Sequence, residues 1–178
     1  MKHIFVINPN AGKDNVVEKL KNELKAFPDL DIETYETTGE QDATRFVKAY
    51  CEAHPDEKIR FYACGGDGTL NEVASGAAGF PQASITCYAS GSGNDFVKYY
   101  GGKERFLNLE KLLRTEDERP IDLFRVNDRW CINVFNFGFD SCVGDTMIKV
   151  KRKPIIGGKR AYVTGVVNAL LMAMKTDC

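Results

Sequence analysis

Short apolar runs that alternate with helix-like stretches constrain the fold of this chain more than any other feature. The runs at residues 4–7 and 59–64 are mostly apolar, and a third one covers residues 84–88. Such runs are typical of strands covered on both faces, as in a parallel sheet. A further run at residues 32–37 mixes polar and apolar side chains, which predicts a strand near the edge of the sheet.

The runs are followed by stretches in which apolar residues recur every three or four positions. Val17, Leu20, Leu24 and Phe27 form one such stripe, and others cover residues 43–51, 70–74 and 106–113. This spacing predicts amphipathic helices. Repeated strand–helix units predict an α/β fold with a mainly parallel sheet flanked by helices.

The strand–helix rhythm changes near residue 126. Residues 121–126 and 130–135 read as strands separated by a short turn at Asn127 and Asp128, and a helix-like run follows at residues 161–174. We therefore predict an α/β domain at residues 1–125 and, at residues 126–178, the beginning of a second, β-rich domain that the chain does not complete. The alternative is one larger domain with C-terminal helices.

Charge and cysteine content limit the partners and the location. A formal net charge of −1 argues against non-specific binding of nucleic acid, which requires a field of Lys and Arg. The cysteines include no C-x-x-C pair, and the N-terminus has no secretory signal. The apolar run at residues 161–174 is too short to span a bilayer. We expect a soluble, cytoplasmic protein without a transmembrane segment.

A glycine-rich turn follows the predicted strand at residues 59–64. Gly65, Gly66 and Gly68 have no Cβ atoms that would hold a phosphate away from the backbone. Thr69 is expected to cap the next helix, with Glu72 completing a capping box. The free N–H groups of that first turn, together with the helix dipole, would bind an anion.

Asp67 lies inside this turn and needs a separate explanation. A carboxylate beside a phosphate site repels the ligand unless a cation or a transferable proton stands between them. Magnesium, held directly or through water, is the simplest answer for a nucleotide ligand. The alternative is a tight strand–helix turn with a solvated Asp67.

Two more polar turns follow predicted strands. One covers residues 8–13 and includes Lys13; the other covers residues 91–96, where Asp95 could equally be a helix cap. Since the carboxyl ends of parallel strands meet at one edge of a sheet, the three turns should converge there. Asp122 lies at or within a fifth predicted strand, where burial without a partner would be costly, so it should meet a cation, a donor or water.

Taken in order, the three turns resemble the catalytic domain of diacylglycerol kinases and of their bacterial and sphingoid-base lipid kinase relatives. The resemblance is carried by N-P-x-A-G-K at residues 8–13, G-G-D-G-T-L-N-E-V at 65–73 and G-S-G-N-D-F at 91–96, with Asp122 and the N-F-G-F-D segment at 136–140 matching later positions. NAD kinases and phosphofructokinases also carry G-G-D-G, and their α/β fold is the one implied. The N-E-V and N-D-F continuations favour the lipid kinases.

The resemblance implies transfer of a phosphoryl group from ATP, with Mg²⁺, to a lipid hydroxyl. Asp67 would serve in catalysis, and Asp67, Asp95 and Asp122 would organise magnesium and water. The nucleotide would be held by the matching turn residues, which are Asn8, Pro9, Gly12, Lys13, Gly65, Gly66, Asp67, Gly68, Thr69, Glu72, Gly91, Ser92, Gly93 and Asn94.

Two departures qualify the resemblance. Ser92 stands where the family commonly has Thr, which keeps the hydroxyl. Family members are also longer, and a later β-rich region supplies their general base, so we expect that base to lie beyond residue 178. We then expect the chain alone to bind nucleotide weakly and to have little or no kinase activity. A NAD kinase-like transferase and a nucleotide-binding module without catalysis are the alternatives.

A lipid kinase has to reach a substrate at a membrane surface. A basic cluster at residues 149–160 could face anionic headgroups at about 1 kcal/mol per well-placed charge, which would make the protein peripheral at the membrane. A solvated loop is the alternative. The acceptor stays open among diacylglycerol, a sphingoid base, an undecaprenol-like alcohol and a glycolipid, and the oligomeric state is equally open. The cluster consists of Lys149, Lys151, Arg152, Lys153, Lys159 and Arg160.

Overall fold

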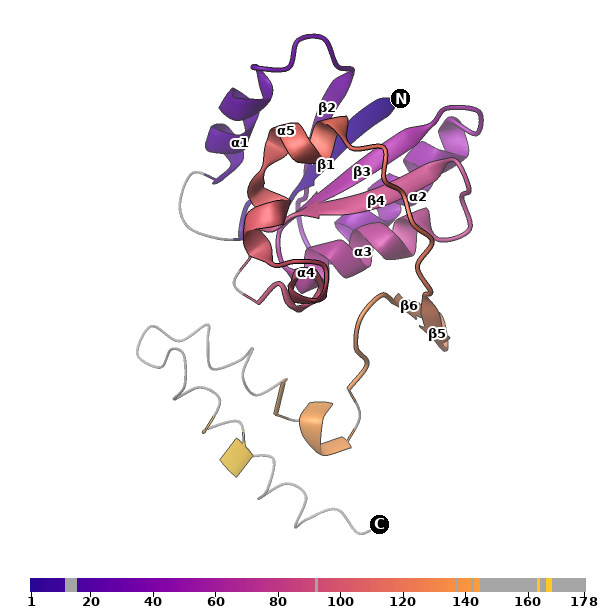
Figure 1. Cartoon of the computed structure of the whole chain (residues 1–178). Coiled ribbons are helices and arrows are strands. Elements are labelled where there is room, and N and C mark those ends of the chain that lie inside the picture. The colour runs from indigo at the N-terminus through magenta and orange to yellow at the C-terminus, as the bar shows by residue number, and fades with distance from the viewer. Residues whose placement is uncertain are drawn as a thin grey trace. The chain divides into compact units, whose positions relative to one another are not determined.

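The computed structural model describes residues 1–11, 16–91, 93–136, 138–141 and 143–144, with residues 163, 166 and 167. The chain divides into two compact units, Met1–Asn133 and Val134–Cys178. The first unit contains the sheet and its covering helices (Figure 1).

Four parallel strands form the sheet, which confirms the predicted fold class. Their order is β2-β1-β3-β4, so each strand pairs in parallel with its neighbour. The strands are β1 (Lys2–Ile7), β2 (Ile32–Glu36), β3 (Ile59–Cys64) and β4 (Ala83–Tyr88). β2 is an edge strand with partly exposed side chains, as its mixed pattern predicted.

Helices cover both faces of this sheet. Figure 1 shows α2 and α3 on one face and α1 and α5 on the other. The long helices are α1 (Val16–Leu24), α2 (Asp42–Ala53) and α3 (Asp67–Ala77). After β4 come α4 (Asp95–Tyr99), the 3-10 helix η1 (Lys103–Leu107) and α5 (Leu109–Arg114), followed by the hairpin strands β5 (Phe124–Val126) and β6 (Arg129–Cys131).

Alternate residues of the central strands build two cores. Ile4 and Val6 of β1 pack with α2 and α3, whereas Phe5 and Ile7 pack with α1 and α5. All four are fully buried, and Phe5 stacks on Tyr62 with 4.2 Å between ring centroids. Burial of each such side chain contributes about 1.5–3 kcal/mol, so the continuous apolar runs drive the two-sided layering.

The structure shifts several predicted helix boundaries. α1 ends at Leu24 rather than at Phe27, because the following N–H groups bond three residues back in turns. The predicted stripe at 106–113 is two elements, separated at Asn108. The Asn108 side chain accepts a hydrogen bond from Lys111 N at 3.0 Å and thereby caps α5. The short helix α4 was not predicted.

The β5–β6 hairpin turns at Asn127 and Asp128 as expected, but both strands are shorter than predicted. The hairpin belongs to the first compact unit, whereas the predicted boundary after residue 125 falls within it. Asn71 of α3 provides the link: its side chain donates to Trp130 O at 3.2 Å and accepts from Ile132 N at 3.0 Å. Most of the predicted second domain and the basic cluster at 149–160 lie outside the described residues.

Across the described residues, we find no helix with both the length and the apolar character needed to cross a membrane. Cys64 and Cys87 are buried free thiols. Burial raises the pKa of Cys87 to about 12. That thiol is therefore protonated at neutral pH and is not a nucleophile.

Candidate functional site

The three predicted turns meet at the carboxyl edge of the sheet. Backbone hydrogen bonds join them: Asn8 N donates to Cys64 O at 3.0 Å, Gly65 N to Tyr88 O at 3.3 Å, and Gly91 N to Gly65 O at 2.9 Å. The predicted convergence is thus confirmed. We call the described turn residues, 8–11, 65–69, 90–91 and 93–96, the glycine-turn rim.

Two glycines are required by close approach within this rim. A Cβ atom on Gly91 would lie 2.4 Å from Gly66 Cα and 2.7 Å from Gly66 N, so the two turns touch backbone to backbone. A Cβ on Gly65 would lie 2.2 Å from Thr69 Oγ1. Such contacts are far inside van der Waals distance. A larger residue at Gly91 would therefore force the two turns apart, and one at Gly65 would collide with Thr69.

Helix α3 begins earlier than the sequence predicted. Its N-cap is Gly66, which has an extended backbone and no side chain to cap the helix, and Thr69 lies inside the first turn. The prediction of a Thr69–Glu72 capping box is therefore wrong. Thr69 is buried and accepts a hydrogen bond from Asn8 Nδ2 at 3.2 Å. Glu72 instead accepts from Gln41 N at 3.1 Å, at the start of α2.

The first turn of α3 leaves room for an anion. The first N–H groups of a helix have no partner within it, and the helix dipole adds positive potential there. Gly68 is exposed in this turn, and a Cβ placed on it would meet no atom within 4 Å. The start of the helix is thus open to a ligand at Gly68, whereas Gly65 and Gly66 make the close contacts of the turn.

Asp67 is the first residue of α3 and also supports α4. Its Oδ1 accepts a hydrogen bond from Phe96 N at 3.2 Å, which satisfies a donor in the first turn of α4. Its Oδ2 faces Gly93, where a Cβ would lie only 2.8 Å away. The carboxylate therefore joins the turn after β3 to the turn after β4, a structural role that the sequence did not reveal.

Asn94 is buried and has a left-handed backbone conformation, with φ of 53°. Its side-chain amide donates to Gly91 O at 2.7 Å and to Ala89 O at 3.4 Å. Asn tolerates this backbone region better than most residues. The predicted ligand-binding Asn94 thus directs its amide to the carbonyls of its own turn.

We expect Asn94→Ala to lower the free energy of unfolding by about 2 kcal/mol, because buried carbonyls lose their donor and alanine is strained at positive φ. Asn94→Gly removes the same hydrogen bonds without the backbone strain, so it should cost less. Urea denaturation of both variants measures the difference. Equal losses would show that the backbone conformation contributes nothing.

The predicted acidic cluster is not assembled. Asp95 is exposed and forms an ion pair with Lys98 Nζ at 2.5 Å. Asp122 is exposed in the segment before β5, so the expectation that it lies on a covered strand is wrong. No group of three or more Asp, Glu, His or Cys side chains that could hold a metal occurs among the described residues. Of the three predicted aspartates, the structure places only Asp67 within the contacts that join the turns.

The remaining predicted residues divide into two groups. Asn8 is half-buried and Pro9 exposed, both directly after β1, and Gly93 is exposed beside Asp67. Gly12, Lys13 and Ser92 lie outside the described residues.

Sequence reasoning did not single out Ser90. Its Oγ is buried and has no hydrogen-bond partner among the described residues. Ser90 directly precedes Gly91, two residues after the end of β4 at Tyr88, and its position in the Ser-Gly-Ser-Gly run was the available signal. A buried hydroxyl without a partner is uncommon in folded proteins and suits a ligand that brings an acceptor. Together with the open first turn of α3, it fits the phosphates of a nucleotide.

The fold and the site together define a class of protein, namely a parallel α/β domain whose glycine-rich turns are joined at the carboxyl ends of its strands. The family model described as diacylglycerol kinase catalytic domain matches residues 2–126. The chain belongs to this family.

Individual relatives agree with this assignment. The diacylglycerol kinase of Bacillus subtilis is 32% identical over 138 residues, which covers 75% of this chain and 45% of that protein. A Cronobacter sakazakii protein named probable lipid kinase YegS-like is 31% identical over 179 residues, covering 97% of this chain and 57% of its own length. A diacylglycerol kinase crystal structure from Bacillus anthracis superposes with a TM-score of 0.54 at 26% identity, covering 72% of this chain and 47% of that one. The chain thus spans about half the length of these relatives.

Proposed function

We propose that the glycine-turn rim binds the phosphates of ATP, and that the protein to which this chain belongs transfers a phosphoryl group to a lipid hydroxyl at a membrane surface. The observation that carries the proposal is the backbone contact between Gly66 and Gly91, which brings the open start of α3 next to the turn that contains Ser90. Membership of the diacylglycerol kinase catalytic domain family supports it.

Different rim residues have different proposed tasks. The N–H groups around Gly68 and the Ser90 hydroxyl donate to phosphate oxygens. The turn after β1, with Asn8 and Pro9, flanks the same edge. Gly12 and Lys13, which lie outside the described residues, follow in the sequence, and Lys13 would add a cation. Ser92 and Gly93 extend the turn after β4. The other predicted nucleotide-binding residues hold these groups in place through contacts within and between the turns. They are Gly65, Gly66, Thr69, Glu72, Gly91 and Asn94.

Asp67 is the residue we propose for magnesium. Mg²⁺ is commonly held by one or two carboxylates together with substrate phosphates, so a single carboxylate at the rim is a suitable donor. When bound, ATP supplies the phosphoryl group, and Mg²⁺ neutralises charge on its phosphates. The carboxylate of Asp67 would hold the ion while keeping its hydrogen bond from Phe96 N. Because no group of three or more possible metal ligands occurs among the described residues, the proposal assigns the ion to Asp67 rather than to a cluster with Asp95 and Asp122.

The alternatives predict different ligands. A NAD kinase-like transferase would bind NAD, and the names of the relatives favour a lipid kinase instead. A binding module without catalysis would bind Mg-ATP but would not turn it over. Titration with NAD and with Mg-ATP tests the first alternative, and a lipid phosphorylation assay on the full-length protein tests the second. The same assay on these 178 residues tests the prediction that they alone have little kinase activity.

Gly68→Ala tests the nucleotide site itself. We expect unchanged or slightly higher stability, because alanine favours a helix by up to about 1 kcal/mol over glycine. The added methyl group would, however, occupy the space proposed for phosphate, and we expect about tenfold weaker binding of Mg-ATP by calorimetry, equivalent to about 1.4 kcal/mol. Gly39→Ala is the matched control, since its Cβ also meets no atom within 4 Å. Unchanged affinity in Gly68→Ala would place the phosphates elsewhere.

A further inference from the structure

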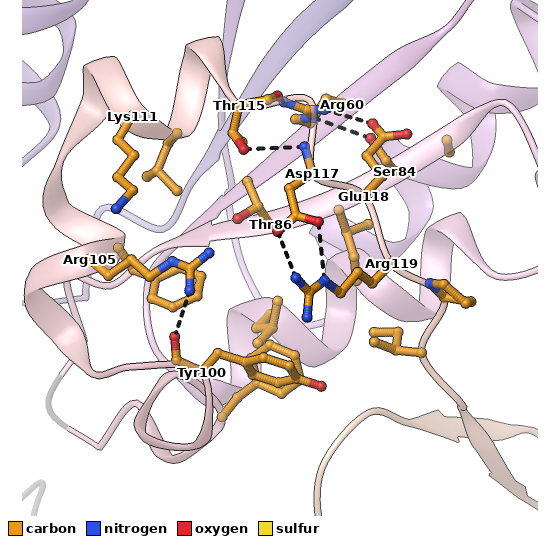
Figure 2. A pocket seen from close by; sticks show the side chains of 18 residues that line it. Arg60, Ser84, Thr86, Tyr100, Arg105, Lys111, Thr115, Asp117, Glu118 and Arg119 are labelled. Carbon is orange, nitrogen blue, oxygen red and sulfur yellow. Dashed lines mark hydrogen bonds and ion pairs between the residues drawn. The ribbon is translucent and has the colours of Figure 1, made fainter.

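A pocket lies along β4, an edge strand of the sheet, and its lining does not include the exposed Gly68. Its volume is about 600 Å³. Figure 2 shows it between β4, the α4–η1 segment, α5 and the chain at residues 115–121. Pockets that bind small molecules commonly measure about 300–1,000 Å³ and combine apolar walls with a few polar groups.

The walls of this pocket are largely apolar. Ile85 of β4, Phe96 of α4 and Phe106 of η1 line it and are only partly buried. Ile121 is 36% exposed at another side. Because exposed apolar surface is unfavourable in water, a ligand that covered these side chains would gain about 25 cal/mol per Å² of apolar surface.

The two carboxylates of the pocket are already paired. Glu118 accepts a hydrogen bond from Arg60 Nη2 at 2.7 Å, and this bond holds the pKa of the Glu118 carboxyl below its usual value. Asp117 accepts two bonds from Arg119, each of 3.1 Å, with the same effect on its pKa. Both acids are therefore ionised at neutral pH, and each has its own arginine (Figure 2).

Two further cations of the pocket have no carboxylate bound to them. Within the part of the chain that the structure describes, neither Lys111 nor Arg105 forms an ion pair. The positive charge of Arg105 nevertheless contributes to lowering the pKa of the Asp117 carboxyl. Arg105 makes one long hydrogen bond, from Nη1 to Tyr100 O at 3.4 Å. Figure 2 shows both side chains on the same wall, with the Lys111 amine directed toward Arg105. The pocket therefore carries net positive charge beside its apolar walls.

We propose that this pocket is a ligand site for an amphiphile with a phosphate monoester head. The head binds Arg105 and Lys111, because a guanidinium and an ammonium on one wall suit a compact dianion. The apolar body covers Ile85, Phe96 and Phe106. The pocket reaches α3 at Leu70 but does not include Gly68, and it does not depend on nucleotide binding at the glycine-turn rim. Phe96 nevertheless belongs to both, since its N–H bonds Asp67.

Titration of the full chain with three probes tests this proposal. Hexyl phosphate carries both features, inorganic phosphate only the head and hexanol only the apolar body. By calorimetry we expect hexyl phosphate to bind at least about tenfold more tightly than either of the others. In ¹⁵N NMR spectra it should shift the backbone amides of Ile85, Thr86 and Phe96.

Arg105→Gln and Lys111→Gln should each weaken hexyl phosphate binding about tenfold, which is within the range for hydrogen bonds to charged groups. Both side chains are exposed, so the fold should be unaffected, and Lys48→Gln on α2 is the matched control. Binding that is equal for hexyl phosphate and inorganic phosphate, or unchanged in both variants, would overturn the proposal.

Two further experiments identify the source of the ligand and distinguish this pocket from the glycine-turn rim. Binding to phosphatidylcholine vesicles that contain a phosphate-monoester lipid, but not to pure phosphatidylcholine vesicles, supports a membrane lipid. Binding of hexyl phosphate alone supports a soluble ligand. Gly68→Ala should leave hexyl phosphate affinity unchanged even where it weakens ATP binding, whereas a parallel loss would place the probe at the glycine-turn rim and overturn the proposal.

Discussion

Replacing Gly91 with alanine should lower the free energy of unfolding by about 3 kcal/mol. The new methyl group would lie 2.4 Å from Gly66 Cα, and the atoms in its way are backbone atoms that cannot rotate aside. The turns after β3 and β4 would have to separate. Their hydrogen bond from Gly91 N to Gly65 O, 2.9 Å in the structure, would then lengthen or break.

Urea denaturation measures this loss, with Gly68→Ala and Gly39→Ala as controls that add the same methyl group in open space. We expect both controls to stay within about 1 kcal/mol of the parent chain. The Gly91 variant should also lose most of its thermal shift with Mg-ATP, because the rim no longer holds its geometry. Parent-like stability in Gly91→Ala would mean that the two backbones do not touch as described.

The second large effect is expected at Asp67, where a metal role and a structural role can be separated. Asp67→Asn keeps an oxygen that accepts from Phe96 N but removes the charge. We therefore expect stability within about 0.5 kcal/mol of the parent. In contrast, the magnesium-dependent part of ATP binding should fall by about 10–100-fold, as for other groups that support a metal.

Asp67→Ala removes both the charge and the acceptor, so it should additionally lose about 1 kcal/mol of stability, the usual contribution of a helix cap. Calorimetric titration with ATP, with and without Mg²⁺, distinguishes the two roles. Asp95→Asn is the matched control, because its carboxylate is exposed and bonded to Lys98. If Asp67→Asn binds Mg-ATP as the parent does, Asp67 only caps α4 and the metal role is excluded.

The sequence predicted the layering of the fold well, because that layering follows from local periodicity. The run at Ile4–Ile7 is apolar at every position, and such a strand has to be covered on both faces. The mixed pattern of β2 likewise identified an edge strand. The meeting of three turns followed from these facts, since parallel strands end at the same edge.

The predictions from sequence failed where the partner or the burial of a residue depends on parts of the chain that are distant in sequence. Glu72 stands at capping-box spacing from Thr69, but it bonds Gln41 N in another helix. Asp122 looked buried from its apolar neighbours, yet β5 starts only at Phe124 and the preceding segment is exposed. Spacing along the chain carries no information about such partners.

From the sequence alone come the α/β class, the edge position of β2, the three turns and the family resemblance. Only the tertiary structure decided that Gly66 starts α3, that Asp67 supports α4, that Asn94 bonds its own turn and that the buried Ser90 hydroxyl has no partner in the described part of the chain. The physical reason is the sequence separation between the residues that are in contact. Strand and helix periods are set by neighbouring residues, whereas the contacts that join the rim connect positions as distant as Asn8 and Thr69, and they exist only once the sheet has formed.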